Sequence, residues 1–413
     1  MNDQLDPGAQ IDARAAALSS KVIAWRRDLH QHPELSNREI RTGGVVAAHL
    51  QALGLKVQTG IAHTGVVGLL ENARPGPVIA LRADMDALPV AEEVDLPFAS
   101  KSRAVFNGQD VGVMHACGHD CHVAILMGVA ELLAGMKQQL CGTIKFIFQP
   151  AEEGPPPGEE GGAAMMIRQG VLEKPKPEVI FGLHVFAGVE AGTIAYRSGP
   201  AMASSDRIRV TVTGRQTHGA LPWRGVDPIV ISSQIVLGLQ TIVSRQVDVS
   251  LEPAVVSIGA IKGGVRDNII PETVDMLGTV RTFNEEMRAD IHARIRNTVE
   301  MIARSAGASA QVHFDNAYPV TVNDASLTER MVPTLQRVAG TDKVFVGQKI
   351  TGYEDFSYYQ QKIPGFFYFL GITPPGTDRK QSAPNHSPRF FVDESALVLG
   401  VRSLAHLTLD YMR

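Results

Sequence analysis

Hydrophobic and polar positions in the first half of the chain follow two spacings. Apolar residues recur at helical spacing over residues 18–29, 42–53 and 122–136. Short apolar runs of strand length cover residues 78–83, 143–148 and 179–185. Because these strands alternate with helices, the pattern predicts an α/β fold with a mainly parallel sheet flanked by helices.

Polar side chains suited to chemistry stand near the end of each predicted strand. Asp84 and Asp86 follow the first strand, and Glu152 and Glu153 follow the second. His184 lies near the end of the third. Since ligands bind beyond the carboxyl ends of parallel strands, we expect these side chains to border one site.

The middle of the chain has a different order of elements. Strand patterns cover residues 207–213, 254–261, 272–281 and 311–314, and helical patterns cover residues 227–246 and 285–306. The resulting order β-α-β-β-α-β predicts a ferredoxin-like α+β domain. Its ends lie close together, so it can be inserted into a loop of another domain. We therefore expect a first domain built from residues 1–198 and 317–413, and an inserted domain over residues 199–316.

Composition and charge limit the possible partners. A chain of 413 residues predicts two domains. The formal net charge of −4, without any polybasic run, argues against nucleic acid as a partner. The amino terminus does not resemble a signal peptide, and no apolar stretch reaches the roughly 20 residues of a membrane span. Three cysteines are too few for a disulfide framework, which favours a cytoplasmic protein.

The segment VMHACGHDCH concentrates residues that bind metals. Cys117 and His119 are two positions apart in a turn that contains glycine, and their donor types suit zinc or a similar divalent ion. The alternative is an ordinary turn at a helix entrance. Asp120 is interpreted as the cap of the following helix. His115 and His122 are left open as ligands, supporting donors or packing residues.

The segment QPAEEG supplies two adjacent carboxylates. One of Glu152 and Glu153 could bind a metal while the other accepts a proton from metal-activated water. A solvated acidic loop is the alternative, and it is the interpretation given to Glu159 and Glu160 in the proline-rich patch 155–162. His30 and His32, in HQHPEL, are interpreted as structural. The sequence contains no HExxH, GxSxG, P-loop, GxGxxG or zinc deaminase signature.

Ten sequence blocks together carry a resemblance to a known family. They occur in order along nearly the whole chain: RRDLHQHPELS, ALRADMDALPV, GVMHACGHDCHVA, FIFQPAEEG, GLHV, TGRQTHGALPWRGVDPI, NIIPETV, GTVRTFN, GYEDFS and NHSPRF. In these blocks the sequence resembles the aminoacylase and carboxypeptidase family of two-metal amidohydrolases. It is most similar to the branch that contains hippurate hydrolases and plant auxin-conjugate (indole-acetyl-amino-acid) hydrolases.

The resemblance implies a function and a set of metal ligands. It implies hydrolysis of the amide bond of N-acyl-amino acids by a metal-bound hydroxide, with Glu152 as the general base. The implied cofactors are two divalent ions, Zn, Mn or Co. The implied ligands are Cys117, His119, Glu153, His184 and His386. Other branches of the family have His-Met-Asp where this chain has Asp84-Met85-Asp86, so Asp86 is interpreted as an orienting residue.

The resemblance also implies roles for the inserted domain. His218 matches a histidine that reaches the metal site of a partner subunit and stabilises an oxyanion. Asn268 matches a substrate-binding residue, and Arg281 is suited to binding a carboxylate in bidentate fashion. These matches predict that the inserted domain acts as a lid and a dimerisation surface, and that the protein is a homodimer or a higher homo-oligomer.

Two other functions stay open at this point. A dipeptidase or carboxypeptidase would use the same metals on the same scaffold. A non-catalytic ligand-binding homologue would be expected to have lost Glu152 or a ligand, and the sequence retains all of them. The preferred acyl group, the preferred amino acid and the native metal do not follow from the sequence.

Overall fold

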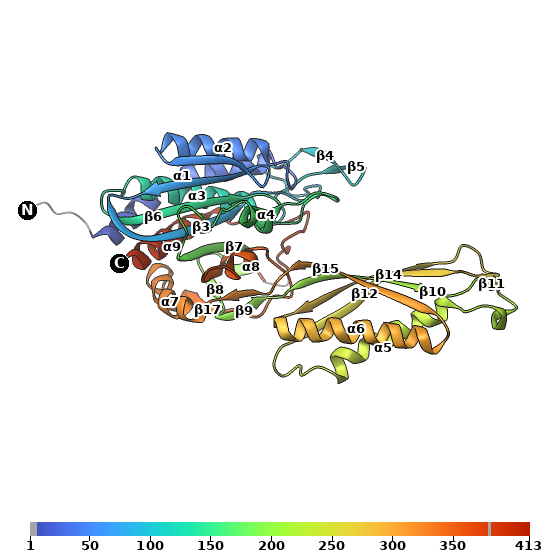
Figure 1. The fold of residues 1–413 in the computed structure, drawn as a ribbon. Coiled ribbons are helices and arrows are strands. Elements are labelled where there is room, and N and C mark those ends of the chain that lie inside the picture. Colours follow the sequence, from blue (N-terminus) through green and yellow to red (C-terminus); the bar gives the residue numbers. More distant parts are fainter. Residues whose placement is uncertain (1–5, 379–380) are drawn as a thin grey trace, which may run out of the picture. The chain divides into compact units, whose positions relative to one another are not determined.

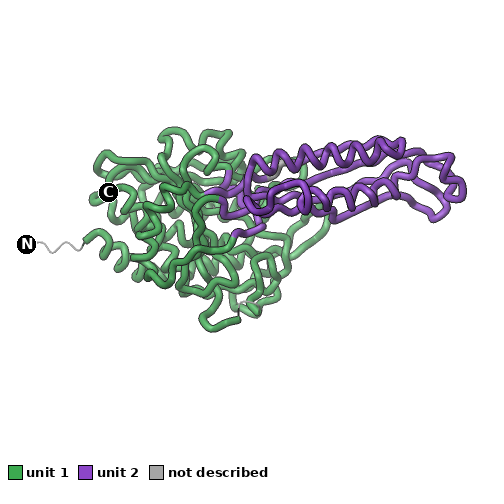
Figure 2. Tube along the Cα trace, turned by 90° about the horizontal axis from the view of Figure 1, so that it is seen from below, with its two compact units in different colours: residues 1–199, 323–348, 358–413 green, residues 200–322, 349–357 purple. Residues whose placement is uncertain are grey.

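The computed structural model describes residues 6–378 and 381–413, and it divides the chain into two compact units (Figure 2). Unit 1 comprises Met1–Gly199, Asn323–Gln348 and Tyr358–Arg413, and unit 2 comprises Pro200–Val322 and Lys349–Ser357. The sequence pattern ends the inserted block at residue 316, whereas unit 2 also takes in residues 349–357. Residues 349–357 group with unit 2 because Ile350 forms a β-bridge with Met202 of that unit.

The main sheet of unit 1 has the strand order β1-β2-β6-β3-β7-β18-β8-β17 (Figure 1). Its strands are β1 (Lys56–Ile61), β2 (Gly65–Glu71), β3 (Arg74–Asp84), β6 (Cys141–Gln149), β7 (Val179–Glu190), β8 (Ile194–Tyr196), β17 (Val344–Val346) and β18 (Gly365–Thr373). Neighbours β6, β3 and β7 run parallel, as the sequence predicts. β18, which the sequence pattern did not predict, runs parallel to β7. Antiparallel pairing occurs towards the sides, between β1 and β2, β2 and β6, and β18 and β8. All of β18 is buried, which is typical of a strand covered on both faces.

Helices pack on this sheet and at its ends. The helices are α1 (Pro7–Gln31), α2 (Ile40–Ala52), α3 (His119–Ala134), α4 (Gly162–Arg168), α7 (Ala325–Ala339) and α9 (Leu397–Met412), with the 3₁₀ turns η2 (Thr341–Lys343) and η3 (Glu394–Ala396). The short helix α8 (Phe356–Gln360) begins in the last residues of unit 2 and ends in unit 1. α3 is buried on nearly every side because it packs against α1, α9 and β3. α1 begins well before the predicted residue 18, since the Asp6 side chain accepts a hydrogen bond from the Gly8 amide and Pro7 suits the first turn.

Two small two-stranded ribbons lie outside the main sheet. β4 (Arg103–Phe106) pairs with β5 (Gln109–Gly112), and β9 (Gly199–Met202) pairs with β16 (Thr321–Asn323).

Unit 2 has the ferredoxin-like order that the sequence predicts. Its elements are β10 (Ser205–Thr213), β11 (Thr217–His218), η1 (Pro222–Arg224), α5 (Pro228–Arg245), β12 (Ala254–Gly263), β13 (Ile269–Ile270), β14 (Thr273–Thr282), α6 (Glu285–Ser305) and β15 (Ser309–Tyr318). The antiparallel sheet has the order β12-β14-β10-β15, and β11 and β13 form a separate short ribbon. Ile235 of α5 and Ile295 of α6 pack with Val210 and Met276 of the sheet in one apolar core.

α5 is the one helix in the described part of the chain that is long and apolar enough to cross a membrane, judged by length and composition alone. Its buried residues Ile231, Ile235, Leu239 and Ile242 belong to the core of unit 2. Asp227 caps the helix by accepting hydrogen bonds from the amides of Ile229 and Val230. These contacts are those of a core helix in a folded domain.

A buried carboxyl group joins three loops of unit 1. Glu39 is 0% exposed, and its Oε1 accepts hydrogen bonds from the amides of Asn37 (3.1 Å) and Ala151 (2.9 Å). Its Oε2 accepts a hydrogen bond from the Thr64 hydroxyl (2.6 Å). Ala151 has a φ of 54°, which a residue with a Cβ rarely adopts, so the bond to Glu39 stabilises an unfavourable turn. Burial, and then the nearby Asp86 carboxylate, raise the pKa of Glu39 to about 8.

This pKa predicts how the stability of the metal-free protein depends on pH. Between about pH 4.5 and about pH 8, Glu39 holds a proton in the folded chain and loses it in the unfolded chain. The folded state therefore binds more protons, and the contribution of Glu39 to the free energy of unfolding falls as the pH rises. In the protonated acid, Oε2–H donates to the Thr64 hydroxyl oxygen while Oε1 still accepts from the two amides. Glu39→Gln offers the same donor and acceptor without a titration and should flatten this fall. Denaturant unfolding in chelator at several pH values measures it, and an unchanged slope in the variant would contradict the assignment.

Candidate metal centre

The five side chains that the sequence assigns as ligands come from separate parts of unit 1. Cys117 precedes α3, and His119 is the first residue of α3. Glu153 follows β6, and His184 lies in β7. His386 belongs to the loop between β18 and η3.

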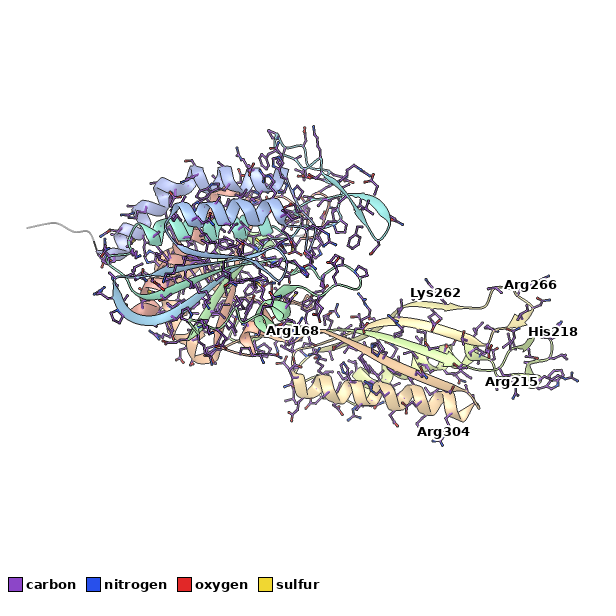
Figure 3. The ribbon with its side chains drawn as sticks, turned by 45° about the horizontal axis from the view of Figure 1, so that its top comes forward. Arg168, Arg215, His218, Lys262, Arg266 and Arg304 are labelled. Atoms are coloured by element: carbon purple, nitrogen blue, oxygen red, sulfur yellow. The ribbon has the colours of Figure 1, made fainter. Side chains whose placement is uncertain are left out.

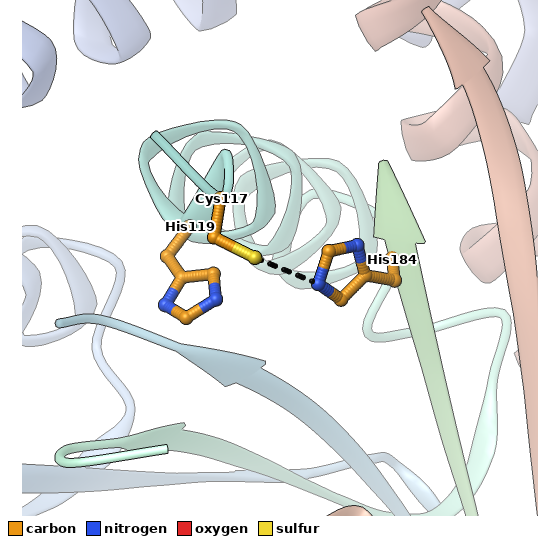
Figure 4. A group of neighbouring side chains, drawn as sticks. All are labelled: Cys117, His119 and His184. Atoms are coloured by element: carbon orange, nitrogen blue, oxygen red, sulfur yellow. Dashed lines mark hydrogen bonds between the residues drawn. The ribbon is translucent and has the colours of Figure 1, made fainter. Parts of the chain in front are cut away.

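The turn at Cys117 and His119 depends on the glycine between them. Gly118 has a φ of 92°, and a Cβ at this position would lie 2.3 Å from Cγ2 of Val185. Glycine alone fits this close approach to β7. The turn therefore directs Cys117 and His119 towards the end of the sheet where His184 lies (Figure 4).

The ligand atoms gather into two groups that share one sulfur atom. Sγ of Cys117 lies 3.4 Å from Nε2 of His184 and 3.2 Å from Nε2 of His386. Nε2 of His386 lies 3.1 Å from Oε1 of Glu153. The groups Cys117, His119, His184 and Cys117, Glu153, His386 each have donor atoms within 4.8 Å of one another.

Two of the imidazoles are oriented by hydrogen bonds from their other nitrogen. Nδ1 of His184 donates to the Val185 carbonyl (2.7 Å), and Nδ1 of His119 donates to Oδ1 of Asp86 (3.3 Å). Each bond leaves Nε2 facing the cluster. Nε2 of His119 is buried and has no hydrogen-bond partner among the described residues. This is the arrangement of metal-binding histidines, whose second nitrogen is held by a carboxylate or a carbonyl.

The electrostatics of the cluster favour a cation. Burial alone would lower the pKa of His119, but the Asp84 and Asp86 carboxylates raise it to about 10. Burial raises the pKa of the Cys117 thiol well above its usual range, and the Glu153 and Glu152 carboxylates raise it further. Without a cation, this position therefore holds protons on sulfur and nitrogen. The thiol, imidazole and carboxylate donors fit a divalent ion such as zinc, which would take the place of those protons.

Asp86 holds the two adjacent glutamates in place. It is 1% exposed, and its oxygens accept hydrogen bonds from the amides of Glu152 (3.0 Å) and Glu153 (3.0 Å). It also accepts a bond from the Ser36 hydroxyl (2.7 Å). With the bond from His119, these contacts are those of an orienting residue.

Asp84 and His122 form a support for β7, which is one of the roles that the sequence left open for His122. Nε2 of His122 accepts a hydrogen bond from the Val185 amide (2.8 Å), so its proton lies on Nδ1, which donates to Oδ1 of Asp84 (2.5 Å). Both nitrogens are thus used, which argues for a supporting role over ligation. Oδ2 of Asp84 accepts a bond from Arg82 (2.6 Å). The contacts from Arg82 through Asp84 and His122 to the Val185 amide fix the strand beside His184. These segments are distant in sequence, so the contacts become visible only in the folded structure.

The prediction that Asp120 caps α3 is wrong. The N-cap position is Gly118, and Asp120 lies inside the first turn. Oδ2 of Asp120 accepts hydrogen bonds from Nε of Arg26 (2.8 Å) and Nδ1 of His30 (2.8 Å). The other ring nitrogen of His30 contacts Glu92 (3.1 Å). Both nitrogens therefore face carboxylates, as expected of a structural residue. His115 is buried nearby, its ring centroid 6.5 Å from that of His30, and it has no hydrogen-bond partner among the described residues.

The two acidic residues of the proline-rich patch are paired. Glu159 binds Arg38 (2.5 Å) and Asn37 (3.0 Å), and Glu160 binds Arg168 (2.7 Å). Glu159 therefore ties the patch to the loop between α1 and α2, whereas Glu160 is 75% exposed, as expected of a solvated acidic residue.

Two of the three predicted residues in unit 2 lie side by side. His218 of β11 is opposite Ile269 of β13, and the Gly219 amide donates to the Asn268 carbonyl (2.8 Å). A surface hollow is lined by Gln216, Thr217, His218, Arg266, Asn268 and Ile269. Figure 3 places His218 with Arg215 and Arg266 at one end of unit 2. Nδ1 of His218 accepts a bond from the Ala220 amide (3.0 Å), so the neutral ring presents Nε2–H outward as a donor.

Arg281 lies at the opposite end of the same sheet. It pairs with Val255 near one end of β14, whereas the ribbon of His218 lies beyond Thr273 at the other end. Arg281 is eight residue steps along β14 from Thr273, a span of roughly 26 Å. The Arg281 guanidinium lies 5.2 Å from the ring centroid of Tyr353, which stacks on Tyr318 at 4.6 Å.

Known proteins match the chain over most of its length. Thermostable carboxypeptidase 1 of Saccharolobus solfataricus is 41% identical over 391 residues, 94% of each chain. N-acetylcysteine deacetylase of Bacillus subtilis is 39% identical over 95% of this chain and 97% of its own. IAA-amino acid hydrolase ILR1-like 4 of Arabidopsis thaliana is 36% identical over 95% of this chain and 86% of its own.

The fold matches as well as the sequence. The solved structure of the Bacillus subtilis YxeP protein, described as a dinuclear metal-binding peptidase of the M20 family, has a TM-score of 0.80 and 36% identity. The match covers 96% of this chain and 99% of that one. The model of Peptidase family M20/M25/M40 matches residues 80–410. The chain belongs to peptidase family M20/M25/M40.

Proposed function

We propose that this hydrolase cleaves the amide bond of N-acyl-amino acids and releases a carboxylic acid and a free amino acid. The observation that carries the proposal is the convergence of Cys117, His119, His184, Glu153 and His386, with the buried Glu152 beside them. Two relatives named for N-acyl-amino acid substrates, the N-acetylcysteine deacetylase and the IAA-amino acid hydrolase, support this substrate class.

Two divalent ions would fit the two donor groups, with Cys117 common to both. The first would be held by Cys117, His119 and His184, and the second by Cys117, Glu153 and His386. The thiolate favours zinc over magnesium, and manganese and cobalt fit the remaining donors. When bound, such ions acidify a water molecule and polarise the substrate carbonyl.

Glu152 is suited to move the proton. It is 4% exposed, and its Oε2 lies 3.8 Å from Nε2 of His119. Its amide is held by Asp86, which fixes the backbone from which the carboxylate extends. Glu152 would accept a proton from the attacking water and deliver it to the leaving nitrogen of the substrate. Glu153, in contact with His386, would stay at the second ion.

The geometry of unit 2 supports a site shared between two chains. His218 would donate Nε2–H to the oxyanion, with Asn268 beside it, and Arg281 would bind the substrate carboxylate. Since these residues lie at opposite ends of one sheet, roughly 26 Å or more apart by strand length, one small substrate cannot meet both in one copy of unit 2. Arg281 of one chain and His218 of its partner would together complete each site.

A dimer surface is available on unit 2. β12 is an edge strand of the sheet, so one side of its backbone can pair with another strand. Large apolar side chains on and near β12 and α5 are exposed, among them Leu237 (71%), Leu251 (72%) and Val255 (40%). A second copy of this chain would cover them and pair with the edge.

Three free cysteines fit a reducing compartment, and we propose the cytoplasm.

A carboxypeptidase or dipeptidase is the second candidate, because the carboxypeptidase of Saccharolobus solfataricus is 41% identical. A panel of N-acetyl-, N-benzoyl- and indole-acetyl-amino acids, assayed beside dipeptides on chelated protein reloaded with one metal at a time, separates the two. We expect a higher kcat/KM on acyl-amino acids. Faster cleavage of dipeptides across the panel would favour the peptidase. No turnover with any metal would favour a non-catalytic homologue.

The roles of the adjacent glutamates predict different defects. Glu152→Gln should keep both metals and lose about 10²–10⁴-fold in kcat, the scale of general acid–base catalysis. Glu153→Gln should instead lose metal, with activity partly restored at high metal concentration. Metal analysis of the purified variants and steady-state kinetics measure both. A fully metallated Glu152→Gln protein with normal turnover would remove Glu152 as the base.

The shared site predicts complementation between two inactive variants. His218→Ala should retain metal and fold while losing about 10²–10³-fold in kcat, the scale for one oxyanion donor. When it is mixed with Glu152→Gln, each heterodimer contains one site with both residues intact, and activity should partly return. Differently tagged subunits verify that exchange has occurred. Exchange without recovery would mean that His218 acts within its own chain or has no catalytic role.

A further inference from the structure

Of the five proposed ligands, His386 has an exposed side chain and an unfavourable backbone conformation. Its side chain is 54% exposed, against 9% for Glu153 and 0% for His119. It lies in a loop, and its φ of 71° is unfavourable for a residue with a Cβ. The Nε2 atom nonetheless lies close to both Cys117 and Glu153. Neighbouring residues must therefore hold the loop in place.

The preceding residue, Asn385, makes the contacts that do so. Its Nδ2 donates to the Cys117 carbonyl (3.0 Å) and to the Val185 carbonyl (3.2 Å). Its Oδ1 accepts a hydrogen bond from the Ala187 amide (3.0 Å). One carboxamide thus joins the His386 loop to the turn of Cys117 and to the strand of His184. A bond from the His386 amide to the Ala116 carbonyl (2.8 Å) adds to this frame.

The Val185 carbonyl connects Asn385 to a second ligand. The same oxygen accepts the bond from Nδ1 of His184 that leaves Nε2 of that ring facing the cluster. The amide of Val185 is in turn held by His122. A carbonyl has two lone pairs, so Asn385 and His184 can share it without competition.

We propose that Asn385 is a positioning residue of the metal centre, which raises the affinity for the ion at Cys117, Glu153 and His386 by fixing His386. The inference rests on the proposed occupation of the two donor groups. An amide is suited to this position because it offers two donor hydrogens to two carbonyls and one acceptor to an amide. Aspartate lacks the donor hydrogens, and serine is too short to bridge the segments.

Two variants separate hydrogen bonding from packing. Asn385→Ala removes the carboxamide altogether, whereas Asn385→Leu keeps the branched shape and removes the hydrogen bonds. Each should weaken the binding of one of the two ions by about 10–100-fold, the usual effect of losing a residue that supports a metal ligand. The effect on the ion at Cys117, His119 and His184 should be smaller, since His119 and His184 keep their own supports.

Asn323→Ala is the matched control. Asn323 is, like Asn385, a bridging amide of unit 1, and it is buried. Its Nδ2 donates to the carbonyls of Arg197 (2.8 Å) and Phe367 (2.7 Å), and its Oδ1 accepts from the Phe367 amide (2.7 Å). None of these three bonds reaches a segment that bears a proposed ligand. The control should lower Tm and leave both metal affinities unchanged.

The measurement is a stepwise titration of the chelated full-length protein with Co²⁺. It is followed by the thiolate-to-cobalt absorption and checked by chelator competition, with Tm of the metal-free proteins recorded beside it. Wild-type protein should bind two ions, and both Asn385 variants should bind the weaker ion with reduced affinity. Wild-type affinities in Asn385→Leu, or a loss no greater than in Asn323→Ala, would overturn the proposal. Failure of the wild-type protein to bind a second ion would contradict the proposed function itself. This result differs from failure of the Asn385 proposal, in which the wild-type protein binds both ions and the Asn385 variants bind them equally well.

Discussion

The centre of unit 1 depends on the burial of negative charge. Asp84, Asp86 and Glu152 are 0%, 1% and 4% exposed, and Glu153 adjoins them. Carboxylates in such a place cost several kcal/mol each unless positive charge and hydrogen bonds compensate. Arg82 compensates Asp84 directly. The other carboxylates face imidazoles and a thiol, so a divalent cation is the compensation that this set of side chains suits.

The remaining contacts can be understood as the frame around that charge. Asp86 fixes the two glutamates through their amides, and His122 fixes the strand of His184. Gly118 allows the turn of Cys117 to approach β7 closely. Each of these residues orients a proposed metal ligand and is not itself one of the proposed ligands. Such a frame reduces the reorganisation needed when an ion binds, which is how supporting residues raise metal affinity.

The sequence alone predicted the alternation of strands and helices, because apolar spacing reports which face of an element is buried. It did not predict β18, a fully buried strand, or the start of α1, which a cap at Asp6 determines. The wrong cap at Asp120 has a physical cause. A short acidic residue at a helix entrance is typical of a cap, but here the buried Arg26 and His30 compete successfully for its carboxylate.

The candidate site was accessible only in part from local patterns. The spacing of Cys117 and His119 indicates a metal, but His386 lies 269 positions from Cys117 and needed the family resemblance. The supports from Asp84, His122 and Asn385 join segments distant in sequence, and no periodicity encodes such contacts. The positions of His218 and Arg281 at opposite ends of one sheet likewise become visible only when the strand register is known.

The most direct test of this account is the position of the metals themselves. Crystals grown with zinc or manganese, with anomalous data collected at the absorption edge of that metal, would locate each ion. We expect two peaks per chain, both within bonding distance of the Cys117 sulfur, about 2.3 Å for zinc. One of them should also contact His119 and His184, and the other Glu153 and His386. A single peak, or peaks that leave Cys117 uncoordinated, would contradict the shared-sulfur centre on which the proposed chemistry depends.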